Sequence, residues 1–87
     1  MTSRSVYLGT AANSYVESSS SSVRTELDYL LERMRVEDLE RISHSIVNDP
    51  TLFVARIGRY RMVYRKVPDG IEIVSVIDAE TAKSALK

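Results

Sequence analysis

The most informative stretch of the chain is Arg56-Ile-Gly-Arg-Tyr-Arg-Met-Val-Tyr-Arg65, in which two runs of β-branched and aromatic residues meet at Gly58 and Arg59. Such runs favour strands, and a two-residue connection that contains glycine suits the tight turn of a hairpin. The pattern therefore predicts one strand from Thr51 to Ile57 and a second from Tyr60 to Val67.

A third strand is expected directly after this hairpin. Val67-Pro68-Asp69-Gly70 is typical of a turn, because proline presets φ and glycine takes the left-handed conformation. The run from Ile71 to Ile77 is almost continuously apolar, which favours a central strand. Asp78 is then expected to cap a short terminal helix from Ala79 to Leu86.

The first half of the chain predicts one strand followed by helices. Ser5 to Gly9 favours a strand, and Ala11 to Glu17 a short helix. Ser22 is the expected N-cap of a longer helix. That helix has its apolar residues at helical spacing, at Val23, Leu27, Leu30, Leu31 and Met34.

A second helical series follows, and it ends before Pro50. Its apolar members are Val36, Leu39, Ile42, Ile46 and Val47, and they predict either a separate helix or a kinked continuation. Helices segregated from an antiparallel sheet define the α+β class. With 87 residues, the chain is expected to form a single domain over residues 1–87.

Composition narrows the function classes. The chain has no cysteine, which excludes disulfides and thiolate metal sites, and its motifs suggest no cofactor. It lacks an apolar run long enough for a signal peptide or a membrane span, so we expect a cytoplasmic protein without membrane contact.

Twelve basic residues balance twelve acidic ones, but the bases are concentrated in one acid-free segment. This segment carries Arg56, Arg59, Arg61, Arg65 and Lys66.

The Gly58-Arg59-Tyr60-Arg61 run and its surroundings resemble a hallmark of the RelE/ParE toxin superfamily, whose members belong to toxin–antitoxin pairs. In that hallmark an aliphatic-Gly-x-Tyr-Arg-aliphatic-aliphatic-Tyr run precedes a turn and an apolar last strand. Ser22-Val-Arg-x-x-Leu27 likewise resembles the start of the family's long helix. The resemblance implies a RelE-like fold with an N-terminal strand, two or three helices, a three-stranded antiparallel meander in one sheet and a C-terminal helix.

The resemblance also implies a nuclease activity, but most of the catalytic residues of that activity are missing. Nucleases of this family cut messenger RNA on the ribosome by attack of a ribose 2′-hydroxyl on the adjacent phosphate, and Arg61 matches the arginine that holds the phosphate charge. Leu52 and Val54 stand where lysines are expected. Asp78 to Thr81 and the residues after it stand where an arginine and then a tyrosine or histidine are expected.

Strand alternation predicts which side chains share the open face of the sheet. Arg59, Arg61, Val63 and Arg65 are expected on that face, and Tyr60, Met62, Tyr64 and Lys66 on the other. Arg61 is the candidate catalytic residue. The candidate residues for binding nucleic acid or a partner are Arg56, Arg59, Arg65, Lys66, Leu52 and Val54. For the arginines, the competing interpretation is a solvated face or ion pairs with the acidic helices. His44, expected on a helix, suits a surface or capping role.

Two functions remain open at this stage. The first is a toxin that an antitoxin protein neutralises and that acts, if it is an enzyme, on translated messenger RNA. The second is a non-enzymatic RelE-like protein that keeps the fold to bind a partner, as a decayed toxin or a homodimer. The ParE branch, which acts on DNA gyrase without the nuclease residues, is also compatible with the missing groups.

Overall fold

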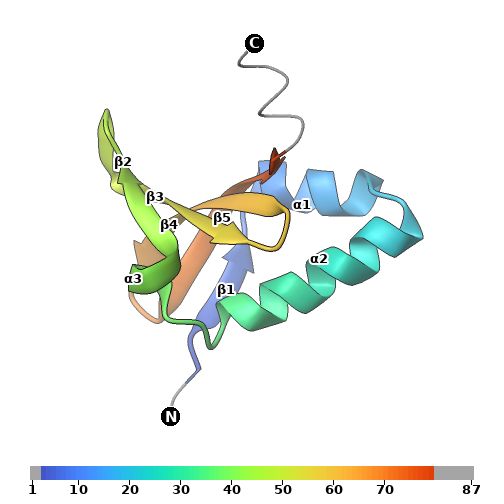
Figure 1. Cartoon of the computed structure of the whole chain (residues 1–87), viewed down its shortest axis with the longest axis horizontal. Helices are drawn as coiled ribbons and strands as arrows, with labels where there is room; N and C mark the ends of the chain where they lie inside the picture. Colours follow the sequence, from blue (N-terminus) through green and yellow to red (C-terminus); the bar gives the residue numbers. More distant parts are fainter. Residues whose placement is uncertain (1–2, 80–87) are drawn as a thin grey trace.

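The fold is α+β, with a five-stranded sheet and two main helices beside one of its faces (Figure 1). The structure is a computed structural model that describes residues 3–79. The elements in chain order are β1 (Ser5–Leu8), α1 (Thr10–Ser18), α2 (Ser21–Met34), α3 (Leu39–Ile42), β2 (Ser43–Ile46), β3 (Asp49–Ile57), β4 (Tyr60–Val67) and β5 (Gly70–Asp78). The helix expected over 79–86 lies, beyond its first residue, outside the described residues.

The strands are ordered β1-β5-β4-β3-β2 across the sheet. β1 is parallel to β5, and the other neighbours are antiparallel. The predicted hairpin is confirmed: β3 and β4 are joined by Gly58 and Arg59, and Gly58 has a φ of 58°. A positive φ at the first residue of a two-residue turn matches the twist of paired strands, and glycine adopts it without steric cost.

The helix predicted between Val36 and Asp49 is wrong for most of its length. The chain makes a single helical turn in α3 and then enters β2, which pairs with β3 at one edge of the sheet. Ser43, His44 and Ser45 have modest helix propensity, and pairing with β3 satisfies their backbone groups instead. The expected meander of three strands therefore has a fourth strand, β2, at its outer edge.

The N-terminus of α2 also differs from the prediction. Ser20, not Ser22, is the N-cap, and its hydroxyl accepts a hydrogen bond from the backbone N–H of Val23 at 3.4 Å. Consecutive serines offer several equivalent capping hydroxyls, so local sequence leaves the first turn ambiguous. The interior of the helix is as predicted, with Leu27, Leu30 and Met34 buried.

The core lies between the helices and one face of the sheet. On β4 the alternation is regular, and Tyr60, Met62 and Tyr64 are 1%, 0% and 2% exposed. On β5 the pairing register shifts at Val74, which has no partner on β4. This bulge resets the alternation. The buried side chains of β5 are Ile71, Ile73 and Val76.

Gly70 is required for a reason that the turn pattern did not indicate. Within residues 3–79 the positive φ angles are confined to Gly58, so Gly70 does not take the expected left-handed conformation. It pairs instead with Ser5 of β1, and a Cβ atom on Gly70 would lie 1.9 Å from the Ser5 carbonyl oxygen. The absence of a side chain therefore allows β1 to join the sheet.

Replacing Gly70 by alanine is expected to destabilise the protein by more than about 1 kcal/mol, because the backbone of β1 must move away from β5. Urea unfolding followed by circular dichroism measures this change in the free energy of unfolding. Ser75→Ala, on the same strand, is the control and should have little effect. Equal unfolding midpoints for Gly70→Ala and the wild type would contradict the steric argument.

Candidate phosphate-binding face

The open face is the face of the sheet opposite α1 and α2, and strand register determines which side chains share it. Directly paired residues point to the same side of a sheet. The register of the strands places four rows on this face: Arg56, Arg61 and Ile77; His44, Val54, Val63 and Ser75; Leu52, Arg65, Glu72 and Tyr7; and Val67, Gly70 and Ser5. The predicted open-face positions of Arg61, Val63 and Arg65 are thus confirmed, and Arg56, Leu52 and Val54 lie on the same face.

Arg56 and Arg61 form a directly opposed pair of like charges on neighbouring strands. Neither guanidinium has an ion pair or a hydrogen bond with another residue among residues 3–79. Like charges that face each other across two strands destabilise a sheet. This arrangement therefore favours an anion that lies over both guanidinium groups.

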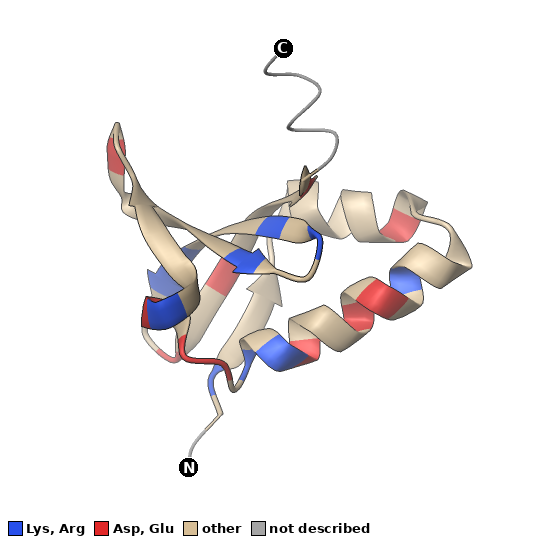
Figure 2. Ribbon diagram, in the orientation of Figure 1, with Lys and Arg blue, Asp and Glu red and all other residues tan. Residues whose placement is uncertain are grey.

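Arg65 is on the same face, but it is already neutralised. Its Nε lies 2.5 Å from Oε1 of Glu72, the residue directly opposite it on β5. Tyr7 follows in the same row, and its hydroxyl donates a hydrogen bond of 2.5 Å to Asp69. That hydrogen bond raises the pKa of Tyr7. Among residues 3–79, the Arg65 end of the face thus carries both signs of charge, whereas the Arg56 and Arg61 end carries only positive charge. Figure 2 marks the basic and acidic positions along the helices and strands.

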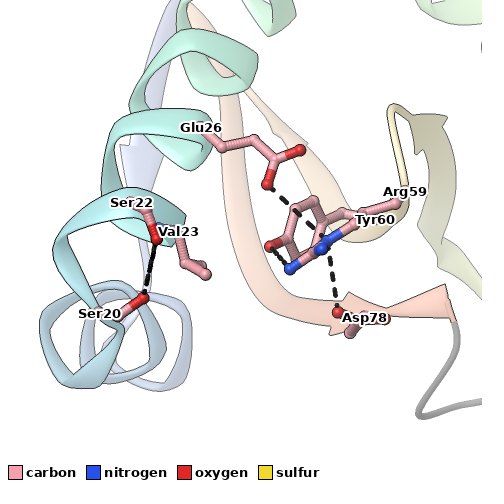
Figure 3. A network of polar contacts seen from close by, with 7 residues as sticks. All are labelled: Ser20, Ser22, Val23, Glu26, Arg59, Tyr60 and Asp78. Atoms are coloured by element: carbon pink, nitrogen blue, oxygen red, sulfur yellow. Dashed lines mark hydrogen bonds and ion pairs between the residues drawn. The ribbon is translucent and has the colours of Figure 1, made fainter.

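Arg59 does not lie on the open face, contrary to the prediction from strand alternation. It occupies the turn, outside the alternating part of the strand, and its side chain points to the helix side (Figure 3). Its Nε lies 3.8 Å from Glu26 of α2 and 3.5 Å from Asp78 of β5, and its Nη2 donates to the Tyr60 hydroxyl at 3.0 Å. This hydrogen bond, followed by the charges around it, raises the pKa of Arg59. For Arg59 the alternative interpretation is therefore correct: it forms an ion pair with an acidic residue of a helix.

Asp78 is also removed from the candidate site. It pairs in register with Tyr60 and not with Arg61, so it projects to the helix side, where it contacts Arg59. A carboxylate on the open face after the last strand would repel a bound phosphate. The structure removes that objection for Asp78, because its carboxylate and the Arg61 guanidinium leave the sheet on opposite sides.

Lys66 lies on the helix side, as the alternation predicts, and so belongs to a different surface from Arg61. Its ammonium lies 5.0 Å from the centroid of the Phe53 ring, which in turn stacks on Tyr64 with centroids 5.5 Å apart. These side chains line a groove of about 890 Å³ that also involves α3 and the turn between β4 and β5. The basic segment thus divides between two faces.

The sequence did not indicate that His44 belongs to the open face. Because β2 replaces the expected helix, His44 is paired with Val54 and joins the open face. The turn-forming Asn48-Asp49-Pro50, directly before a predicted strand, is the signal that would have indicated a hairpin here. In the structure Asp49 accepts hydrogen bonds from the backbone and the hydroxyl of Thr51, which lower the pKa of its carboxyl.

Other kinds of site find little support in the part of the chain that the structure describes. Residues 3–79 bring no three acidic or histidine side chains together as a metal site. Their longest helix, α2, has 14 residues, and none of their helices is long and apolar enough to cross a bilayer.

Comparison with solved structures identifies the fold. A chain of the toxin–antitoxin complex RelBE2 from Mycobacterium tuberculosis matches with a TM-score of 0.73 at 20% identity, over 87% of this chain and 98% of that chain. A conserved hypothetical protein from Helicobacter pylori matches with a TM-score of 0.63 at 13% identity, over 88% of this chain and 96% of its own. No protein-family model and no curated protein sequence matches. The chain therefore has a RelE-like fold.

If Arg56 and Arg61 repel each other across the strands, removing one charge should stabilise the protein. Arg56→Gln is expected to raise the free energy of unfolding by about 0.2–1 kcal/mol at low salt. The gain should shrink at about 1 M salt, where the screening length falls to about 3 Å. Arg65→Gln, which breaks the contact with Glu72, is the control and should give no gain. Chemical denaturation at the two salt concentrations measures both variants, and a destabilised Arg56→Gln protein would contradict the repulsion.

Proposed function

We propose that this protein is the toxin component of a toxin–antitoxin pair and that its open face binds the phosphate backbone of messenger RNA translated on the ribosome. The observation that carries the proposal is the opposed pair of Arg56 and Arg61, which has no counter-charge among residues 3–79. Such a pair suits a phosphodiester, because arginine donates planar, charge-assisted hydrogen bonds to phosphate oxygens. The proposed location of this activity is the cytoplasm.

The chemistry proposed for this face is transfer of the phosphate to the neighbouring ribose 2′-oxygen. Two guanidinium groups over one phosphate stabilise the negative charge that accumulates in the transition state. Arg61 is the residue matched to this role by the resemblance, and Arg56 adds a second cation where the lysines of the family pattern are absent. Leu52 and Val54, which occupy those lysine positions, lie on the same face and supply apolar contact only.

An antitoxin protein is the proposed inhibitor, and it would cover the same face. The RelBE2 structure is that of a toxin bound to its antitoxin. Beside Arg56 and Arg61 the open face presents Val54, Val63 and Ile77. A segment with acidic and apolar side chains would pair with the arginines and bury these aliphatic groups. RNA and antitoxin would then compete for one surface.

The aliphatic side chains of the open face, Val54, Val63 and Ile77, favour a second candidate function. In it the protein binds another protein and catalyses no reaction. In this form the chain is a decayed toxin, a homodimer, or a toxin that acts on gyrase as ParE proteins do. Apolar area beside arginine is typical of the centre of a protein interface. The two candidates differ in whether messenger RNA is cut.

Induction of the wild-type protein in a bacterium is expected to arrest growth and to produce new messenger RNA ends that depend on translation. Arg61→Ala and Arg56→Ala should each abolish the cuts, because each removes a cation from the proposed phosphate site. Arg59→Ala is the matched control, since that arginine faces α2, and it should leave the cuts in place. Sequencing of RNA 5′ ends with and without a translation inhibitor makes the measurement.

The same experiment separates the alternatives. Growth arrest with intact messenger RNA would contradict the nuclease and support a target such as gyrase. Normal growth with intact transcripts would contradict toxicity and support a non-enzymatic binding protein. Size-exclusion chromatography with light scattering then tests for the homodimer.

A further inference from the structure

The residue that extends the proposed site is His44, on the edge strand β2. Its pairing with Val54 places it on the open face. The flanking Ser43 and Ser45 alternate to the helix side, where the Ser43 oxygen accepts a hydrogen bond from the Tyr64 hydroxyl at 3.0 Å. The pairing of His44 and the hydrogen bond of Ser43 thus agree on which face of β2 is the open one.

His44 is a diagonal neighbour of Arg56, and Arg56 is the direct neighbour of Arg61. His44 opposes Val54, and Arg56 lies two residues further along β3 on the same face. Diagonal neighbours on paired strands are separated by about 7–8 Å, and direct neighbours by about 5 Å, distances that long side chains span. The register thus brings an imidazole and two guanidinium groups together from β2, β3 and β4.

We propose that His44 is the proton acceptor of an RNA-cleaving site in which Arg56 and Arg61 hold the phosphate. This inference rests on the proposed function and names a residue in a position for which the RelE/ParE resemblance provides no group. An imidazole accepts protons near neutral pH, whereas guanidinium groups remain charged and can only donate hydrogen bonds. His44 therefore supplies the base that the arginine pair lacks.

The step is a transesterification within the RNA strand. The His44 imidazole takes the proton of a ribose 2′-hydroxyl, and the 2′-oxygen forms a bond to the adjacent phosphorus. The bond from phosphorus to the 5′-oxygen of the next nucleotide breaks, and that oxygen takes a proton from water. The products are a 2′,3′-cyclic phosphate and a 5′-hydroxyl, and the protonated imidazole returns its proton to solvent. Arg56 and Arg61 balance the charge of the pentacovalent phosphorus.

The surroundings of His44 are compatible with this role. The charged residue that the register places on the same face of β3 as His44 is Arg56, with Arg61 directly opposite it on β4. His44 also borders the groove that Asp38, Glu40 and Lys66 line. On α3, which adjoins β2, the charged residues are Glu40 and Arg41, and Arg41 lies 3.6 Å from Glu37.

A binding experiment tests the placement without relying on cleavage. His44 is the single histidine of the chain, so its imidazole signals in a ¹H–¹⁵N NMR spectrum are unambiguous. A short single-stranded RNA methylated at every 2′-oxygen cannot be cut, and it should shift the His44 imidazole together with the amides of Arg56 and Arg61. Shifts at the two arginines without a shift at His44 would overturn this inference and leave the proposed RNA binding intact. No shift at any of the three would overturn both.

A kinetic experiment tests the proton transfer with purified protein, ribosomes and messenger RNA. His44→Gln should lower the cleavage rate by about 10²–10⁴-fold, the usual contribution of a general base, without weakening binding of the methylated RNA. The wild-type rate should fall as the imidazole becomes protonated at low pH, and the variant should lack this fall. Combining His44→Ser with Ser45→His moves the imidazole to the other face of β2, and it should be as impaired as His44→Gln.

The outcomes of the kinetic experiment distinguish the two proposals. Wild-type cleavage that His44→Gln matches in rate and in pH profile would overturn the role of His44 while the nuclease function stands. If the wild type does not cut ribosome-bound messenger RNA, the nuclease function fails and the assignment of His44 as a base fails with it. Circular dichroism melting curves of the variants verify that each one is folded.

Discussion

The register of the hairpin formed by β3 and β4 is the constraint on which the rest of the structure depends. The turn at Gly58 fixes which residues of the two strands oppose each other, and it places Arg56 opposite Arg61 and Ala55 opposite Met62. A slip by one residue would exchange the faces of a whole strand. Core packing and the candidate phosphate-binding pair thus follow from the same pairing, because alternate residues of each strand serve the two purposes.

The sheet also separates charges that are close together in sequence. Arg59 and Asp78 meet on the helix side with Glu26 (Figure 3), whereas the register places Arg56 and Arg61 on the open face. The chain has no net charge, yet one region of the open face carries positive charge with no acid of residues 3–79 beside it. Such local segregation suits a site that must attract a polyanion in a protein that is not basic overall.

Much of the fold was predictable because its signals are local. The apolar series of α2, the bounds of β4 and the hairpin around Gly58 are patterns within about ten residues of sequence. The resemblance carried by Gly58-Arg59-Tyr60-Arg61 agrees with the RelE-like fold of the solved structures. The segment from Val36 to Asp49 was wrongly predicted because its apolar spacing also fits a helix, and pairing with β3 determines the outcome.

The amino-acid pattern was sufficient to establish the α+β class, the strand alternation of β4 and the concentration of basic residues after Pro50. Long-range pairing was needed to bring His44 beside Arg56, to turn Arg59 and Asp78 toward α2, and to make Gly70 a contact point for β1. The physical reason is that helical periodicity and turn chemistry act between neighbours in the chain. The partner of an edge strand, and the face onto which its side chains project, depend on backbone hydrogen bonds to residues that are distant in sequence.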